Sequence, residues 1–205
     1  MTADPSPVHP QAAMPGMLRV LKEEHRNARR LLGMLDHNVG LLANGVDPDY
    51  ELLLAVSGWF CEYPDRCHHP KEDALFHHLR EKDPLASAVC DLAREHRDAR
   101  ARVGRFRDTI QALFREAVVP REKIVGAARS FIDAEREHMK MEEDVLFPLA
   151  MRTFDEGDWH KVEAAIDAAR DPLFGVTVEE DFRLVHEALL AFEGTLLRQT
   201  LVVTL

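Results

Sequence analysis

A duplicated pattern of polar residues constrains the fold of this 205-residue chain more than any other feature. The segment Glu24–Arg29 reads EHRNAR, and the segment Glu95–Arg100, 71 positions later, reads EHRDAR. The segments His68–Glu72 and His138–Glu142, 70 positions apart, both place a glutamate four residues after a histidine. The repeat predicts two similar halves, each of which supplies one lone histidine and one His-x-x-x-Glu pair.

The segments that carry this repeat have a helical periodicity. Apolar residues recur every three to four positions in four stretches of about thirty residues. We therefore expect an all-α, up-down four-helix bundle with a pseudo-two-fold internal repeat over residues 16–153. Asp47 and Asp83, each followed by proline, are predicted to cap helices. Pro64 and Pro70 predict a kink in the second helix, because proline removes a backbone donor.

Two further segments flank the predicted bundle. Residues 1–15 contain four prolines among small and polar residues, and we expect a disordered leader there. Residues 154–205 are predicted to form a C-terminal helical extension that packs on the outside of the bundle.

The composition excludes several classes of protein. A formal net charge of -10 and a pI near 5.5 argue against nucleic-acid binding, which needs a clustered basic surface. No stretch approaches the roughly 18 apolar residues of a membrane span, and the first residues lack the pattern of a signal peptide. We therefore expect no membrane contact and a cytoplasmic location. Three cysteines without Cys-x-x-Cys spacing suggest reduced thiols rather than a disulfide framework.

The repeated polar residues fall on the apolar stripes of the predicted helices. In the first and third predicted helices, one histidine interrupts the apolar stripe. In the second and fourth, a histidine and a glutamate four residues apart lie on the same helix face. The six residues are His25, His68, Glu72, His96, His138 and Glu142. Buried together without compensation, they would cost several kcal/mol. Two cations bridged by the glutamates would neutralise them, an arrangement that suits iron or manganese and is also open to zinc.

A second i,i+4 pair overlaps the first. His69 and Asp73 have the same spacing as His68 and Glu72. The repeat offset of 70 aligns His68 with a histidine but His69 with Met139. This register favours His68 and Glu72 as the ligands.

Two further carboxylates lie on the same stripes. Asp65 and Glu135 are matched by the repeat, and each precedes a predicted ligand histidine by three residues. They could accept hydrogen bonds from the ligating imidazoles, or they could reach solvent.

These residues carry a family resemblance over about residues 17–152. The six predicted ligands, together with Tyr63-Pro64, the HHPKED sequence of residues 68–73 and the LFP sequence of residues 146–148, resemble the hemerythrin-like proteins with an HHE cation-binding domain. The resemblance implies a non-haem centre of two iron ions with an oxo or hydroxo bridge. It also implies a coordination position that is open to O2, NO or peroxide.

The third helix departs from the classical oxygen carriers of this fold. Those proteins have five histidines, two of them in a His-x-x-x-His on the third helix. Here Arg100 follows His96 by four residues and Leu92 precedes it by four. The pattern argues against reversible O2 transport and is closer to the symmetric four-histidine sites of iron-sulfur-cluster repair and iron-sensing members.

Two functions follow from this interpretation. The first is a di-iron protein that binds or reduces O2, NO or peroxide as a sensor, scavenger or detoxifying enzyme. The alternative is an iron sensor or iron donor without turnover, in which metal occupancy changes the stability of the bundle. A purely structural bundle with buried ion pairs would not explain the duplicated ligand spacing.

Overall fold

The structure, a computed structural model, consists of helices and turns. It describes residues 14–85, 91–115, 117–164, 171–175 and 178–203. These residues contain no strand, so the predicted all-α class is confirmed. Residues 1–13 of the predicted leader lie outside the described part of the chain. None of the described helices is both long and apolar enough to cross a membrane.

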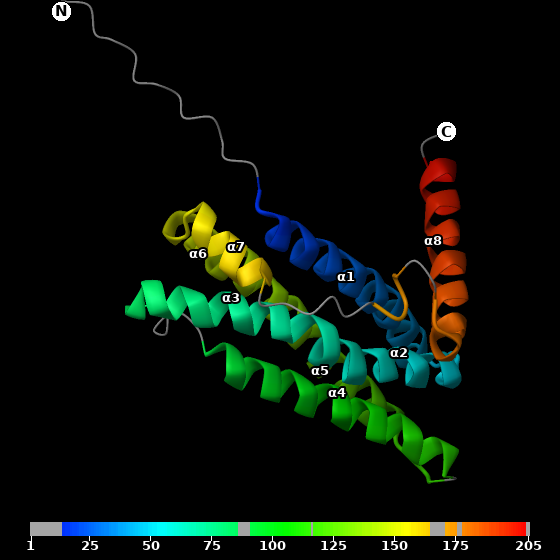
Figure 1. Cartoon of the computed structure of the whole chain (residues 1–205). Helices are drawn as coiled ribbons and strands as arrows, with labels where there is room; N and C mark the ends of the chain where they lie inside the picture. Colours follow the sequence, from blue (N-terminus) through cyan, green and yellow to red (C-terminus); the bar gives the residue numbers. More distant parts are fainter. Residues whose placement is uncertain (1–13, 86–90, 116, 165–170, 176–177, 204–205) are drawn as a thin grey trace, which may run out of the picture.

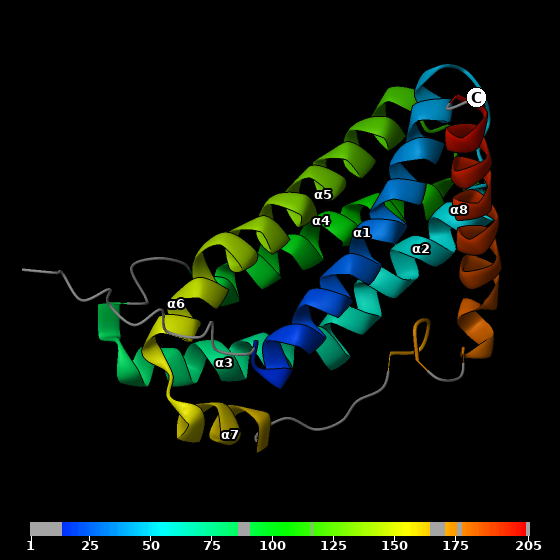
Figure 2. The same cartoon turned by 90° about the horizontal axis from the view of Figure 1, so that it is seen from above.

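Four helical arms form the bundle (Figures 1 and 2). The helices are α1 (Gly16–Ala43), α2 (Tyr50–Tyr63), α3 (His69–Lys82), α4 (Leu92–Phe114), α5 (Arg121–Met141), α6 (Phe147–Thr153), α7 (Glu156–Ala164) and α8 (Arg183–Val203). The pair α2 and α3 makes one arm and the pair α5 and α6 another. Helix α5 packs along α4 and α1, and α2 packs along α4, which closes the up-down bundle.

π turns join the helices within the two composite arms. The first spans Pro64–His68, where the sequence predicts a kink, and the second spans Glu142–Leu146, which the sequence analysis did not predict. A π turn inserts one extra residue into a helix and commonly marks a functional site. Both π turns include residues of the repeated His-x-x-x-Glu pairs.

Asp49 and Asp91 cap the second and third arms. Each carboxylate accepts a hydrogen bond from the backbone N–H three residues later, at 2.9 Å for Asp49 and 3.1 Å for Asp91. The prediction of Asp47 as a cap is wrong, because Asp47 lies in the loop before α2. Asp83 ends α3, and its carboxylate accepts a hydrogen bond from the N–H of Leu85 at 3.0 Å, so it caps the short 3-10 turn that begins at Pro84 and not the start of α4.

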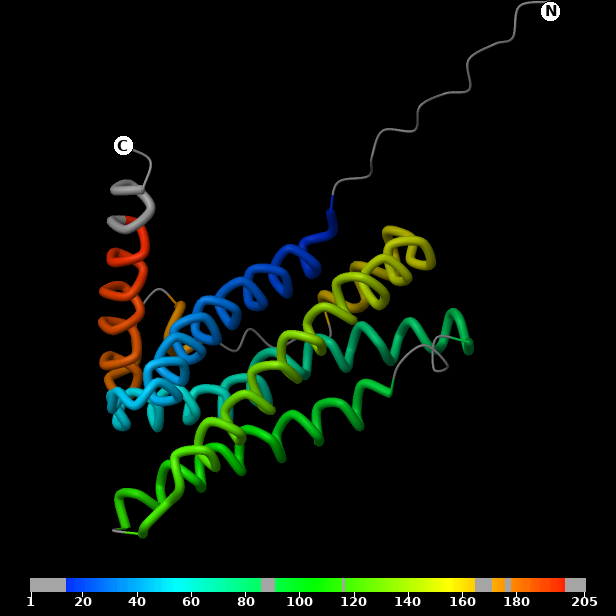
Figure 3. Tube along the Cα trace, turned by 180° about the vertical axis from the view of Figure 1, so that it is seen from behind, coloured from blue at the N-terminus to red at the C-terminus, as the bar shows by residue number. Residues whose placement is uncertain are grey.

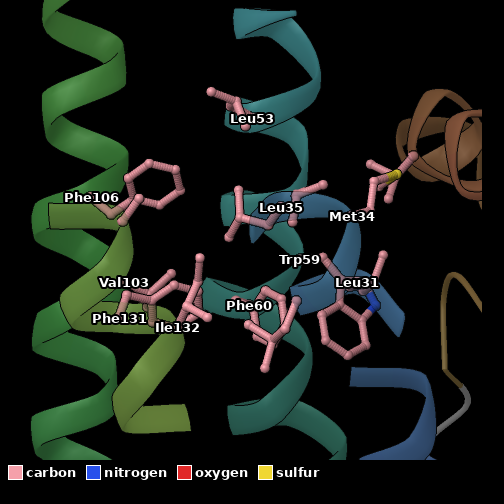
Figure 4. Packing of buried hydrophobic residues seen from close by; sticks show 14 of the residues in the cluster. Leu31, Met34, Leu35, Leu53, Trp59, Phe60, Val103, Phe106, Phe131 and Ile132 are labelled. Carbon is pink, nitrogen blue, oxygen red and sulfur yellow. The ribbon is translucent and has the colours of Figure 1, made fainter. Parts of the chain in front are cut away.

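Two apolar clusters fill the bundle on either side of a polar layer. The larger cluster holds the stacked rings of Phe106 and Phe131, with Phe60 edge-on to Phe131 (Figure 4). The smaller cluster includes Leu21 and Phe147 near the opposite end. The repeated histidines and glutamates occupy the layer between these clusters, so water is excluded on both sides.

The chain beyond the bundle packs on its outside. Helix α7 contacts α1 and α3, and α8 contacts α1 and α2 and then projects past them (Figures 1 and 3). Arg30 of α1 makes a two-pronged ion pair with Glu193 of α8, at 2.6 and 2.9 Å. In α7, Asp158 pairs with His78 and Lys82 of α3 at 2.9 and 2.8 Å.

Candidate metal centre

Four donor side chains converge in the first of two groups, here called site A. Site A consists of His25, His68, Glu72 and Glu142. The Nε2 atom of His25 lies 3.1 Å from Nε2 of His68, 3.3 Å from Oε1 of Glu72 and 3.2 Å from Oε2 of Glu142. The Nε2 atom of His68 lies 3.0 Å from the same oxygen of Glu72.

The second group, site B, is built from three histidines and shares the glutamates. His69, His96 and His138 gather around Glu72. Nε2 of His96 lies 3.3 Å from Oε2 of Glu72, and Nε2 of His138 lies 3.3 Å from Oε1 of Glu142. The ring of His69 stacks on His96, with 3.7 Å between the ring centroids. All six predicted ligands therefore come together, and His69 joins them.

Each glutamate divides its two oxygens between the sites. Glu72 turns Oε1 toward site A and Oε2 toward site B, and Glu142 does the reverse. Donors that lie about 2.1 Å from a common ion at right angles are about 3.0 Å apart, close to the separations found here. The spacing fits two cations bridged by two carboxylates.

The inward-facing atoms have no other partner. Among the described residues, Oε2 of Glu72, both carboxylate oxygens of Glu142, and Nε2 of His96 and of His138 are buried without a hydrogen bond. Glu72 and Glu142 have an exposed fraction of 0 %. Buried polar atoms in proteins are otherwise almost always paired, and an unpaired buried charge is strongly destabilising. The unpaired donors are the observation that most directly implies bound cations.

The two glutamates respond oppositely to burial without a cation. Burial and the nearby Glu72 raise the pKa of Glu142 well above its usual range. Burial also acts to raise the pKa of Glu72, but His68 and the other imidazoles hold it well below its usual range. Two adjacent carboxylates at one buried place do not both ionise unless positive charge compensates them.

A carboxylate faces the outer nitrogen of each of the five imidazoles. The Nδ1–carboxylate pairs are His25–Glu143 at 2.9 Å, His68–Glu24 at 2.8 Å, His69–Asp65 at 3.1 Å, His96–Asp73 at 3.5 Å and His138–Glu95 at 3.2 Å. A carboxylate at Nδ1 favours the tautomer that carries its proton there, so the lone pair of Nε2 points inward. All five rings are thereby oriented as ligands.

The repeat favoured His68 over His69 as a ligand, and the place of His69 in site B was not predicted. The π turn that ends at His68 brings the consecutive side chains of His68 and His69 to the centre. In an ideal α-helix two neighbouring residues would not both face it, so helical periodicity did not predict this arrangement. The two adjacent histidines of the HHPKED segment, residues 68–73, were the sequence feature that could have indicated a second ligand there. Of the two alternatives for Asp65, an imidazole partner is the one observed, and it is His69 and not His68. Glu135 makes no hydrogen bond to a described residue, and burial raises its pKa.

A small cavity of about 20 Å³ adjoins the centre. His25 and His68 of site A lie in its wall, together with Met139, the position that the repeat matches to His69. Its other lining residues are Glu24, Ala28, Trp59, Phe60, Tyr63, Pro64, His69, Glu135 and His138. The space is sufficient for about one water-sized molecule.

The comparisons with known proteins assign the family. Residues 16–150 match the Hemerythrin HHE cation binding domain. No curated protein and no solved structure gave a match. The matched region contains every residue of sites A and B, and the chain belongs to the hemerythrin HHE cation-binding family.

Proposed function

We propose that the chain binds two metal ions, one in each site. The ligands of site A are His25 and His68, and both glutamates bridge to site B. The ligands that complete site B are His69, His96 and His138. The proposal depends above all on the buried donor atoms that face one another without partners.

Iron is the metal that we assign to both sites. Imidazole and carboxylate donors suit iron, and carboxylate-bridged pairs of iron ions recur in the interiors of helical bundles. Manganese and zinc accept the same donors and are the alternatives that metal analysis distinguishes.

The unequal donor sets determine where an exogenous ligand binds. Site A has four protein donors, whereas the residues around site B supply five when Glu142 is included. The cavity beside Met139 touches both histidines of site A, and also His69 and His138 of the site that already has five donors. We therefore place the position open to O2, NO or peroxide at site A, facing this cavity.

The protein surroundings of that cavity restrict its contents. A pair of iron ions supplies the electrons with which a small oxidant or NO is bound or reduced. Trp59 and Phe60 are nearly fully buried and limit water. The hydroxyl of Tyr63 lies beside the Glu24 carboxylate in the cavity wall, and burial raises its pKa so that it keeps its proton. Tyr63 can therefore donate this proton to a polar ligand in place of Glu24.

Anaerobic loading with Fe²⁺ tests this function. We expect about two ions per chain, followed by distinct optical changes when NO, peroxide or O2 is added. Rapid loss of peroxide over many cycles indicates turnover, and a lasting spectral change indicates binding. Two ions without any response to the three ligands would contradict the proposed role.

An iron donor or sensor is the second candidate. The outer carboxylate of His138, Glu95, has an exposed side-chain fraction of 30 %, so site B is not fully enclosed. A donor releases its iron to a chelator within minutes, whereas a redox site retains it. Measuring iron retention in excess chelator distinguishes the two functions.

A further inference from the structure

A groove between α4 and α5 leads from the surface to site B. Its volume is about 350 Å³, and its lining residues are Glu95, Asp98, Ala99, Arg102, Ala134, Glu137, His138 and Met141. Asp98 and Glu137 are exposed, and neither makes an ion pair with a described residue. Three carboxylates and one guanidinium give the groove a negative balance.

His138 connects this groove to the buried centre. The residue is 8 % exposed and lies in the groove wall. Its Nδ1 atom faces Glu95 of the groove at 3.2 Å, while its Nε2 atom faces the centre and has no hydrogen-bond partner. The imidazole of His138 thus lies between the acidic groove and the buried atoms of the centre that have no hydrogen-bond partner.

The other outer carboxylates near the surface are mostly neutralised. Three of the five that face the imidazoles also bind a basic side chain. These pairs are Glu24–Lys71, Glu143–Arg29 and Asp65–Arg100. Asp73, which faces His96, and Glu95 have no such partner among the described residues, but of these two Glu95 lies in the groove, together with two more carboxylates without an ion pair. A cation approaching the centre therefore meets uncompensated negative charge in the α4/α5 groove.

We propose that the α4/α5 groove is the loading port through which a hydrated divalent cation reaches the centre. This inference rests on the metal centre proposed above. Six waters at about 30 Å³ each occupy about 180 Å³, so the groove can hold an ion with its hydration shell. Asp98 and Glu137 raise the local concentration of the cation, and Glu95 lies next to the first donor, His138. Movement of the His138 ring then admits the ion as its waters are replaced by protein donors.

The rate of metal loading tests the port separately from the centre. Co²⁺ is mixed with the metal-free full chain, and its visible absorption is followed by stopped flow. The double variant Asp98→Asn with Glu137→Gln should load about tenfold more slowly at low ionic strength, because steering is lost. At about 1 M salt the difference should disappear, since screening then acts within about 3 Å. The final cobalt content should equal that of the unmodified chain.

A matched double variant controls for net charge. Asp47→Asn with Glu122→Gln removes two exposed carboxylates near the opposite end of the bundle and should load at the unmodified rate. The port is refuted if both double variants load cobalt equally slowly, or if the groove double variant loads it at the unmodified rate. A lower final content in the groove double also overturns it, because the carboxylates then act on the centre itself. An unmodified chain that takes up no metal instead refutes the proposed function.

Arg102 provides a test of opposite sign. It lines the groove and makes no ion pair with a described residue. Arg102→Gln removes the positive charge and should speed loading by about two- to threefold at low ionic strength. A slower rate would contradict the port.

Discussion

Each half of the repeat supplies two histidines and one glutamate to the centre, but the halves differ at matched positions beside these residues. His69 in the first half joins site B, while Met139 in the second half lines the cavity beside the centre. A single exchange of histidine for methionine thus leaves the two sites with different numbers of imidazoles. Duplication explains how two groups of donors come to share their glutamates, and the departure from it gives the two groups unequal numbers of donors.

A second difference concerns how the imidazoles are supported. Lys71 is 6 % exposed and donates to Glu24 at 2.6 Å, which fixes the partner of His68. The matched position in the second half is Met141, and Glu95, the counterpart of Glu24, has no basic partner among the described residues. Site A is therefore held more rigidly than the side of site B that faces the α4/α5 groove.

Removing a bridge should have the largest effect, because both halves depend on it. Glu72→Gln takes a charged donor from both sites, so metal content should fall from about two ions to well below one per chain. Metal analysis after dialysis measures this. Glu122→Gln, an exposed residue of α5, is the control and should retain both ions. Two ions in Glu72→Gln would contradict a shared carboxylate.

Removing a terminal imidazole should affect one site more than the other. His68→Ala should lower metal content to about one ion per chain through loss from site A, and His138→Ala should do so through loss from site B. His69→Ala should weaken site B while leaving site A able to bind its ion. Unchanged affinity in His69→Ala, measured by titration, would remove His69 from the ligand set.

Giving the second half of the repeat the histidine that the first half has should block the coordination position proposed for an outside ligand at site A. Met139→His places an imidazole next to the cavity at site A, and we expect two ions to bind while affinity for NO falls at least about tenfold. Met139→Leu keeps the wall apolar and should preserve NO binding. Equal NO affinity in both variants would show that the outside ligand binds elsewhere.

Loss of the buried lysine should have the smallest effect. Lys71→Met reproduces the second half at this position and releases Glu24, so affinity for the ion in site A should fall about tenfold. The exposed Lys140→Met is the matched control and should bind as the unmodified chain does. Competition with a chromophoric chelator measures both. An unchanged metal affinity in Lys71→Met would show that the ion pair between Lys71 and Glu24 does not contribute to metal binding.

Periodicity and duplication were sufficient to predict the bundle and six of the residues that meet at its centre. His25 and His96 interrupt apolar stripes, and that pattern survives in any straight helix. His69 could not be ranked in this way, because the π turn before it changes which side chains face inward. Glu24 and Glu95 precede the lone histidines in both copies, but their partners on other arms follow only from tertiary packing. The cap of α2 was misplaced by two residues, because this helix begins after Asp49 and not after Asp47, whereas Asp83 caps only a short turn that follows α3.

A crystal structure of the iron-loaded chain, with anomalous scattering measured at the iron edge, shows whether two ions share the glutamates. We expect two peaks roughly 3.5–4 Å apart, both next to the carboxylates of Glu72 and Glu142, with three imidazoles at one peak and two at the other. A single peak, or two peaks that share neither glutamate, would contradict this expectation.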